Sequence, residues 1–166
     1  MQGWTYLSEA GYLAASNASN GEIVNVSARA NLDAGETLIP GFTVIGTKTV
    51  LIRAVGAKLA DLGVANPMAD PRMTLFKMNF DGSPNDEIIV VDDWTEGNIA
   101  KISAAAQHSG LFPFTPAIDF QGIAMPTDDT TSAAALVTLE TGVYTAVVDS
   151  ADGGTGDVLV DVTEVE

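Results

Sequence analysis

The sequence predicts an all-β fold, an antiparallel two-sheet β-sandwich of jelly-roll type with one short helix. Three observations predict it. Short segments rich in Val, Ile and Leu recur along the 166 residues, and 16 glycines and 7 prolines supply turns between them, as in proteins built from many short strands. Only one segment has a sustained helical pattern. About eight strands can be counted, and two packed sheets accommodate that number in antiparallel order.

Each predicted strand is a short apolar or alternating run between turn residues. We expect strands at residues 23–30, 37–45, 49–55, 72–80, 88–91, 133–139, 143–148 and 158–165. Arg53 interrupts an apolar run and is expected to point to the outer face of its sheet. In residues 72–80, the alternating set that contains Phe76 and Phe80 is the more apolar one, so we expect it to face the core. Ile88–Val91 is expected to be a short buried strand.

The helical candidate spans Thr95–Gly110. Thr95 is a suitable N-cap, and apolar residues then recur every three to four positions. One or two helical turns are also expected at residues 57–62, where Gly63 would end them. Residues 111–131 contain prolines and scattered aromatic residues, and they are expected to form a long ordered loop over a sheet edge.

Composition excludes several classes of function. Hydrophobic residues make up 46% of the chain and charged residues 17%, which argues against disorder. The formal net charge is −15, so the surface repels phosphate backbones and anionic lipid, and we expect neither nucleic-acid binding nor membrane insertion. No apolar run approaches the ~20 residues that span a bilayer. The absence of cysteine excludes disulfides, thiolate nucleophiles and cysteine-ligated metal centres.

Several segments together resemble a repeat domain of large secreted and surface proteins of environmental bacteria. The matching pieces are GFTVIG at Gly41–Gly46, KTVLIRAVG at Lys48–Gly56, Asp70-Pro71, Asp92-Asp93-Trp94, LETGVYT at Leu139–Thr145, and Gly153–Val165. The resemblance covers roughly residues 22–166 and is most specific between Lys48 and Asp70.

The resemblance implies a β-sandwich similar to pre-peptidase C-terminal domains, which are non-catalytic appendages outside the cell. It therefore implies an extracellular or cell-surface location and no reaction. Residues 1–15 lack the basic start and apolar run of a signal peptide, so this location depends on the resemblance. The chain departs from the family in two ways, because we interpret it as a single copy rather than an array, and because its last turn is acidic, with Asp149, Asp152 and Asp157.

No catalytic residue is predicted. His108 is the single histidine, and it falls late in the predicted helix, where the helix dipole favours it. A histidine base needs a nucleophile and an orienting acid, and the sequence has no Gly-x-Ser-x-Gly motif. Pairs of carboxylates are expected by chance among 22 acidic residues. An acidic cytosolic enzyme is the weakest hypothesis, because it requires a convergent acid–base pair.

Carboxylates clustered in turns make calcium the cofactor to test, because calcium prefers several oxygen ligands on flexible loops. The first candidate ligands are Asp81, Asn85, Asp86, Asp92 and Asp93. The first three and the last two flank one short strand, so we expect them at opposite ends of it, too far apart to share an ion. Further candidates are Asp128, Asp129, Asp149, Asp152 and Asp157. Asp and Asn are also ordinary turn residues.

The chain divides into an N-terminal segment, residues 1–21, and the β-sandwich domain, residues 22–166. The apolar anchors of the N-terminal segment are Trp4, Tyr6, Leu7 and Tyr12. Such a segment can add a strand to an exposed sheet edge of a neighbouring molecule. It can equally fold back as the first strand of its own domain, and the sequence favours neither arrangement.

These observations predict a non-catalytic extracellular structural or adhesive module whose copies associate with one another, up to a surface fibre, through the N-terminal segment. The alternative is a calcium-stabilised carbohydrate-binding or targeting module of a secreted enzyme, with a polysaccharide as its partner. A sugar binder needs coplanar exposed aromatic side chains. The available candidates are Trp94, Phe112, Phe114 and Phe120.

Overall fold

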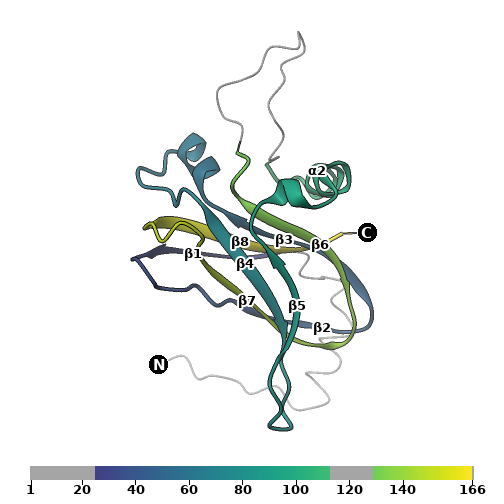
Figure 1. Ribbon diagram of the computed structural model, residues 1–166. Coiled ribbons are helices and arrows are strands. Elements are labelled where there is room, and N and C mark those ends of the chain that lie inside the picture. Colours follow the sequence, from purple (N-terminus) through teal and green to yellow (C-terminus); the bar gives the residue numbers. More distant parts are fainter. Residues whose placement is uncertain (1–24, 113–128, 166) are drawn as a thin grey trace, which may run out of the picture.

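The computed structural model describes residues 25–112 and 129–165, which form two four-stranded antiparallel sheets and short helical elements (Figure 1). The strands are β1 Asn25–Leu32, β2 Gly41–Val44, β3 Lys48–Val55, β4 Pro71–Lys77, β5 Asp86–Val91, β6 Ala133–Leu139, β7 Gly142–Ser150 and β8 Gly156–Glu164. The helical elements are η1 Ala57–Leu62, η2 Trp94–Glu96 and α2 Ile99–His108. The predicted all-β class is confirmed.

The order of the strands is that of a jelly roll. One sheet has the order β1-β8-β3-β6 and the other β2-β7-β4-β5. Each strand therefore pairs with its counterpart from the other end of the chain, β1 with β8, β2 with β7, β3 with β6 and β4 with β5. Two packed sheets of eight such strands are the jelly-roll architecture. The sandwich consequently opens on two sides, one bounded by β1 and β2 and the other by β5 and β6.

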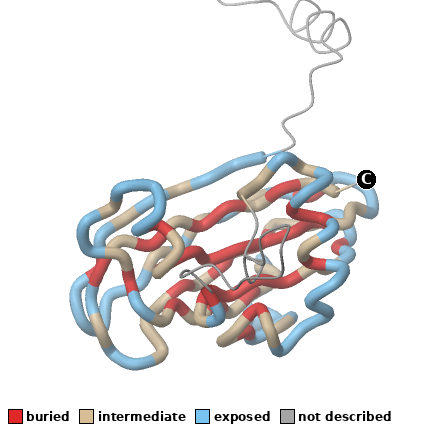
Figure 2. The backbone as a smooth tube through the Cα atoms, turned by 90° about the horizontal axis from the view of Figure 1, so that it is seen from above, coloured by how far each residue is buried: buried red, intermediate tan, exposed pale blue. Residues whose placement is uncertain are grey.

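The main core lies between the sheets, along the central strands (Figure 2). On β4 it contains Met73 and Leu75, both at 0% exposure, so the expectation that the Phe76 and Phe80 set faces inward was wrong. The physical reason is that β4 keeps a regular alternation through its pairing with β7, from Pro71 to Lys77, and the sandwich turns the side of Met73 and Leu75 toward the core. Phe80 is 80% exposed at the hairpin tip.

A second core lies on the outer face of the β1-β8-β3-β6 sheet. Helix α2 contributes Ile102 and Ala106 to it, and the η2 turn contributes Trp94, at 1% exposure. The helix is shorter than predicted, because Asn98 and not Thr95 caps it: the Asn98 side chain accepts a hydrogen bond from the Lys101 backbone N–H at 3.1 Å. Burial of the indole therefore uses a separate turn before the helix begins.

The structure agrees with the other predictions about the helical segments. The η1 turn occupies residues 57–62, and Gly63 ends it with a left-handed φ of 84°, which glycine adopts without steric cost. His108 is the exposed last residue of α2, at the end where the dipole favours a cation. Arg53 does lie on the outer face of its sheet, as expected, but the second core covers that face and leaves the residue at 0% exposure.

Candidate functional site

The most unusual surface feature is the edge strand β5. One side of β5 pairs with β4, and no other described strand pairs with its second side. Its sequence ends in four consecutive β-branched residues, Ile88–Val91. The expectation that this strand is buried was wrong for half of it, because Ile88 is 43% and Val90 49% exposed. Ile89 and Val91 pack toward the core, so the alternation of the strand places Val90 on the outer face of the sheet.

Of the features that commonly prevent sheets from adding strands, the β5 edge lacks lysine and proline, and its charges and its β-bulge lie in the first half of the strand. Its only charges are Asp86 and Glu87 at the first two positions. The pairing of β5 with β4 is regular from Ile89 to Val91, since the register shift lies nearer the hairpin. An apolar, regular edge of this kind is a template for pairing with an extended segment.

The other sheet edges are better protected. Strand β2 has only four residues and follows Pro40. Strand β1 exposes polar residues, Asn25, Ser27, Arg29 and Asn31, on most of its length. Strand β6 contacts helix α2. Among the described strands, β5 therefore offers the best acceptor edge.

A groove of about 350 Å³ runs between β5, β6 and the start of α2. We call it the β5–β6 groove. Its apolar floor is made by Ile89, Val91, Ile102, Ala134 and Leu136. Glu96 and Lys101 also line it, which places one charge of each sign beside the floor. This volume is at the lower end of the roughly 300–1,000 Å³ that small-molecule sites occupy, so it suits one or two large side chains.

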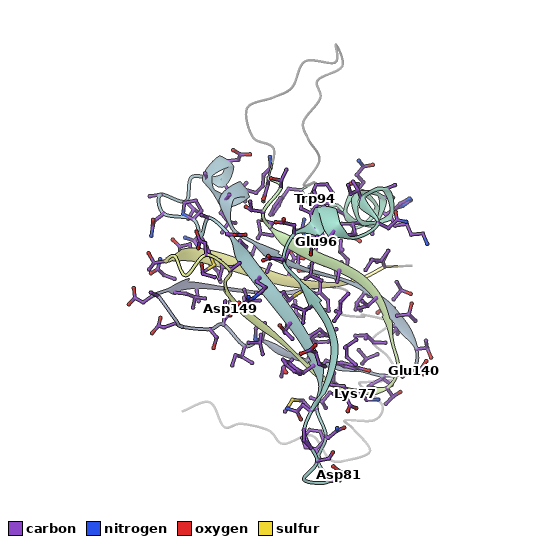
Figure 3. All side chains as sticks on the ribbon, viewed as in Figure 1. Lys77, Asp81, Trp94, Glu96, Glu140 and Asp149 are labelled. Carbon is purple, nitrogen blue, oxygen red and sulfur yellow. The ribbon has the colours of Figure 1, made fainter. Side chains whose placement is uncertain are left out.

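The predicted calcium ligands separate into two groups at opposite ends of β5, as expected. Figure 3 shows Asp81 near one end of the strand, and Glu96, which follows Asp92 and Asp93 in the chain, near the other. At the hairpin tip, one carboxylate oxygen of Asp81 accepts hydrogen bonds from the Ser83 backbone N–H at 2.9 Å and hydroxyl at 2.6 Å. These bonds hold the pKa of Asp81 below its ordinary value. The Asn85 side-chain oxygen likewise accepts from the Asn79 backbone at 3.0 Å.

At the other end of β5, Asp92 and Asp93 lie near further acids. Burial, then the charges of Asp92 and Glu96, raise the pKa of Asp93. Burial, then Asp92 and Asp93, raise that of Asp70. One oxygen of Asp92, Oδ1, is buried without a hydrogen-bond partner. Within residues 25–112 and 129–165, no three acidic or histidine side chains are grouped closely enough to hold a metal ion; calcium binding by Asp81, Asn85, Asp86, Asp92 and Asp93 stays a prediction.

A buried acid that the prediction treated as a minor calcium candidate has a structural role. Asp129 is 5% exposed, and its carboxylate accepts hydrogen bonds from the Thr131 and Ser132 backbone and from the Ser132 hydroxyl. Its carbonyl accepts the indole N–H of Trp94 at 2.7 Å. The Ser132 hydroxyl in turn accepts the Gly56 N–H at 3.1 Å. This network fixes the turn before β6 to the second core.

A buried ion pair joins Arg53 on β3 to Asp161 on β8. The Arg53 Nε lies 3.0 and 3.1 Å from the two carboxylate oxygens, and Nη2 lies 2.6 Å from Oδ2. The Nη1 donates to the Phe112 carbonyl at 2.7 Å, and the guanidinium stacks 4.6 Å from the Phe112 ring centroid. Both charged side chains are almost wholly buried, at 0% and 3% exposure.

These contacts bear on the aromatic residues proposed for sugar stacking. Trp94 is 1% exposed, so its ring is closed to a ligand, and the Arg53 guanidinium covers one face of the Phe112 ring. Phe114 and Phe120 lie outside the described residues, as do the predicted anchors Trp4, Tyr6, Leu7 and Tyr12 and the minor calcium candidate Asp128.

A comparison with solved structures found the pre-peptidase C-terminal domain of a collagenase from Bacillus anthracis. The sequences are 13% identical, the match covers 84% of this chain and 90% of that one, and the TM-score is 0.47. It is the same kind of domain that the sequence resembles. No family model matches the chain, and no curated protein matches it.

In the part of the chain that the structure describes, no helix has the length and hydrophobicity needed to cross a membrane.

Proposed function

We propose that this chain is a non-catalytic structural or adhesive module of the cell surface or the extracellular space, whose copies associate by strand addition. The acceptor is the β5 edge, and the donor is the N-terminal segment, residues 1–21, of a neighbouring copy. The observation that carries the proposal is the apolar run Ile88–Val91 at a sheet edge, which is regular from Ile89 onward and has no described strand on its second side; such an edge is the surface that strand addition uses.

The composition of the donor supports this pairing. The segment has large apolar side chains at Trp4, Tyr6, Leu7 and Tyr12, and Glu9 is its single acidic residue. Main-chain hydrogen bonds to the β5 edge would supply affinity, and side chains that alternate along the donor would supply specificity. The net charge of −15 makes free copies repel one another, so association is expected to strengthen as salt screens that repulsion.

The test is the mass of the full chain in solution, measured by light scattering. Val90→Lys places a charge on the acceptor edge, and Val26→Lys places one at a matched position, because Val90 is 49% and Val26 53% exposed on two different edge strands. The wild type and Val26→Lys are expected to form assemblies, and Val90→Lys to remain at the monomer mass of 17.2 kDa. A wild type that stays monomeric at all salt concentrations would contradict the proposal.

A second candidate function is a calcium-stabilised binding module, which the unpartnered buried oxygen of Asp92 favours. A cation beside Asp92 and Asp93 would neutralise carboxylates that now repel one another. Calcium should then raise the melting temperature of the wild type and not that of Asp92→Asn, with magnesium as the control ion. An equal response of both proteins, or none, would remove this candidate.

A further inference from the structure

We infer that the copies join head to tail, with Trp4 and Tyr6 of one copy seated in the β5–β6 groove of the next, so that association gives an open chain of subunits. This inference rests on the proposed function. It adds the direction of assembly, the site that receives the aromatic anchors, and the reason that assembly does not stop at a dimer.

Strand β1, into which the donor segment leads, and the acceptor strand β5 lie on opposite sides of the sandwich. The donor segment leads into β1, which ends its sheet on one side. The acceptor β5 ends the other sheet on the far side, next to β6. Two different surfaces on opposite sides make a heterologous contact, and such contacts build open filaments unless the rotation between copies closes a ring.

One side of the added strand would face the β5–β6 groove. A strand added to β5 continues the sheet, so every second residue points inward, on the side of Ile89 and Val91. These two residues are the part of β5 that packs toward the core, and they form part of the groove floor. The anchors of the added strand would thus lie against apolar side chains already present.

The spacing of the aromatic residues in the donor segment fits this arrangement. Trp4, Tyr6 and Tyr12 all occupy even positions, so an extended strand presents them on one face. The groove of about 350 Å³ has room for one or two of them, and Trp4 and Tyr6 are adjacent on that face. The Glu96 carboxylate and the Lys101 ammonium at the groove can hydrogen-bond the indole N–H and the phenol oxygen respectively.

Reach does not decide between neighbour and self. The 24 residues before β1 extend to at most about 80 Å, and crossing a four-stranded sheet requires only about 15 Å. The segment could therefore reach the β5 edge of its own domain as well as that of a neighbour. The experiment below separates the two cases.

The experiment mixes two full-length variants. The first, Trp4→Ala with Tyr6→Ala, lacks the donor anchors and keeps an intact acceptor. The second, Val90→Lys, lacks the acceptor and keeps an intact donor. Each alone is expected to remain a monomer of 17.2 kDa. Mixed in equal amounts, they are expected to form a dimer of 34.4 kDa, twice 17.2 kDa, and nothing larger. The dimer uses the one intact donor and the one intact acceptor, and its other donor and acceptor are disabled by the substitutions.

The outcomes are distinguishable. If the wild type never assembles, the proposed function itself is overturned. This outcome includes the case in which each N-terminal segment pairs with its own domain. A wild type that assembles, with a mixture that gives no 34.4 kDa species, overturns head-to-tail joining and leaves self-association standing. Assembly of the Val90→Lys variant by itself also overturns head-to-tail joining through the β5 edge. Val26→Lys serves as the matched control and is expected to assemble as the wild type does.

Discussion

Removal of Asp161 should destabilise this domain far more than removal of Asp149, although both acids face an arginine directly across two strands. Arg53 is the register partner of Asp161, and Arg72 is that of Asp149. Each arginine binds its acid through Nε and Nη2. The pairs differ in what covers them, since the second core buries Arg53, while the Arg72 and Asp149 side chains are 42% and 34% exposed.

The magnitude follows from this difference. Asp161→Ala removes the carboxylate that the buried Arg53 guanidinium binds, and the loss of one partner of a buried ion pair costs about 3–5 kcal/mol. Arg53 keeps other contacts, among them the hydrogen bond to the Phe112 carbonyl and the contact with its ring, so we expect a value near the lower end, about 3 kcal/mol. Asp149→Ala breaks an exposed pair, for which about 0–1 kcal/mol is expected. For a domain of this size, about 3 kcal/mol lowers the melting temperature by roughly 6–12 °C.

The assay is urea denaturation of both variants, monitored by circular dichroism, together with calorimetry to measure the melting temperatures. A paired replacement, Arg53→Met with Asp161→Leu, removes both charges and should restore most of the loss, because well-packed apolar residues can substitute for a buried ion pair. The reasoning is refuted if Asp161→Ala costs no more than Asp149→Ala. It is also refuted if the paired replacement is as damaging as the single one.

Two further predictions concern stability. Burial and neighbouring acids raise the folded-state pKa of Asp93 above its ordinary value of 3.8, so its contribution to stability falls as pH rises through that raised pKa. Asp93→Asn should therefore stabilise the domain at pH 7 by less than about 1 kcal/mol, with no gain in stability below pH 3.8. Thermal melts of both proteins across this pH range test the prediction. A gain in stability that persists in acid would contradict it. Gly56→Ala should cost about 1–3 kcal/mol or more, because a Cβ there would lie 2.3 Å from the Met68 carbonyl oxygen. Gly41→Ala, whose Cβ would meet nothing closer than 3.6 Å, is the control; equal denaturation midpoints for the two variants would refute the steric argument.

The fold could be predicted from the sequence because its signals are local. Apolar runs bounded by turn residues mark the strands, and Gly63 ends the η1 turn where a left-handed residue is needed. The inward face of β4 could not be predicted, since both alternating sets contain apolar residues and only the packing of the sandwich turns Met73 and Leu75 toward the core. That packing depends on the pairing of β4 with β7, which is distant in sequence.

The environment of Arg53 was also beyond sequence reasoning. Its direction followed from alternation in the strand, whereas its burial depends on residues of the α2 region that cover the outer face. The β5 edge is the reverse case. A run of β-branched residues suggested burial, and only the strand order places Ile88 and Val90 at an edge. The ion-pairing of Asp161 and the turn network of Asp129 gave no local signal, because each depends on partners from other elements.

The most direct test of strand addition is amide hydrogen exchange of the full chain, compared between dilute monomer and assembled protein. Strand addition predicts that exchange within Ile88–Val91 slows on assembly, because the unpaired side of β5 gains main-chain hydrogen bonds, while β1 at the opposite side, Asn25–Leu32, keeps its rate. Unchanged exchange in β5 on assembly, or slowing confined to β1, would contradict the account.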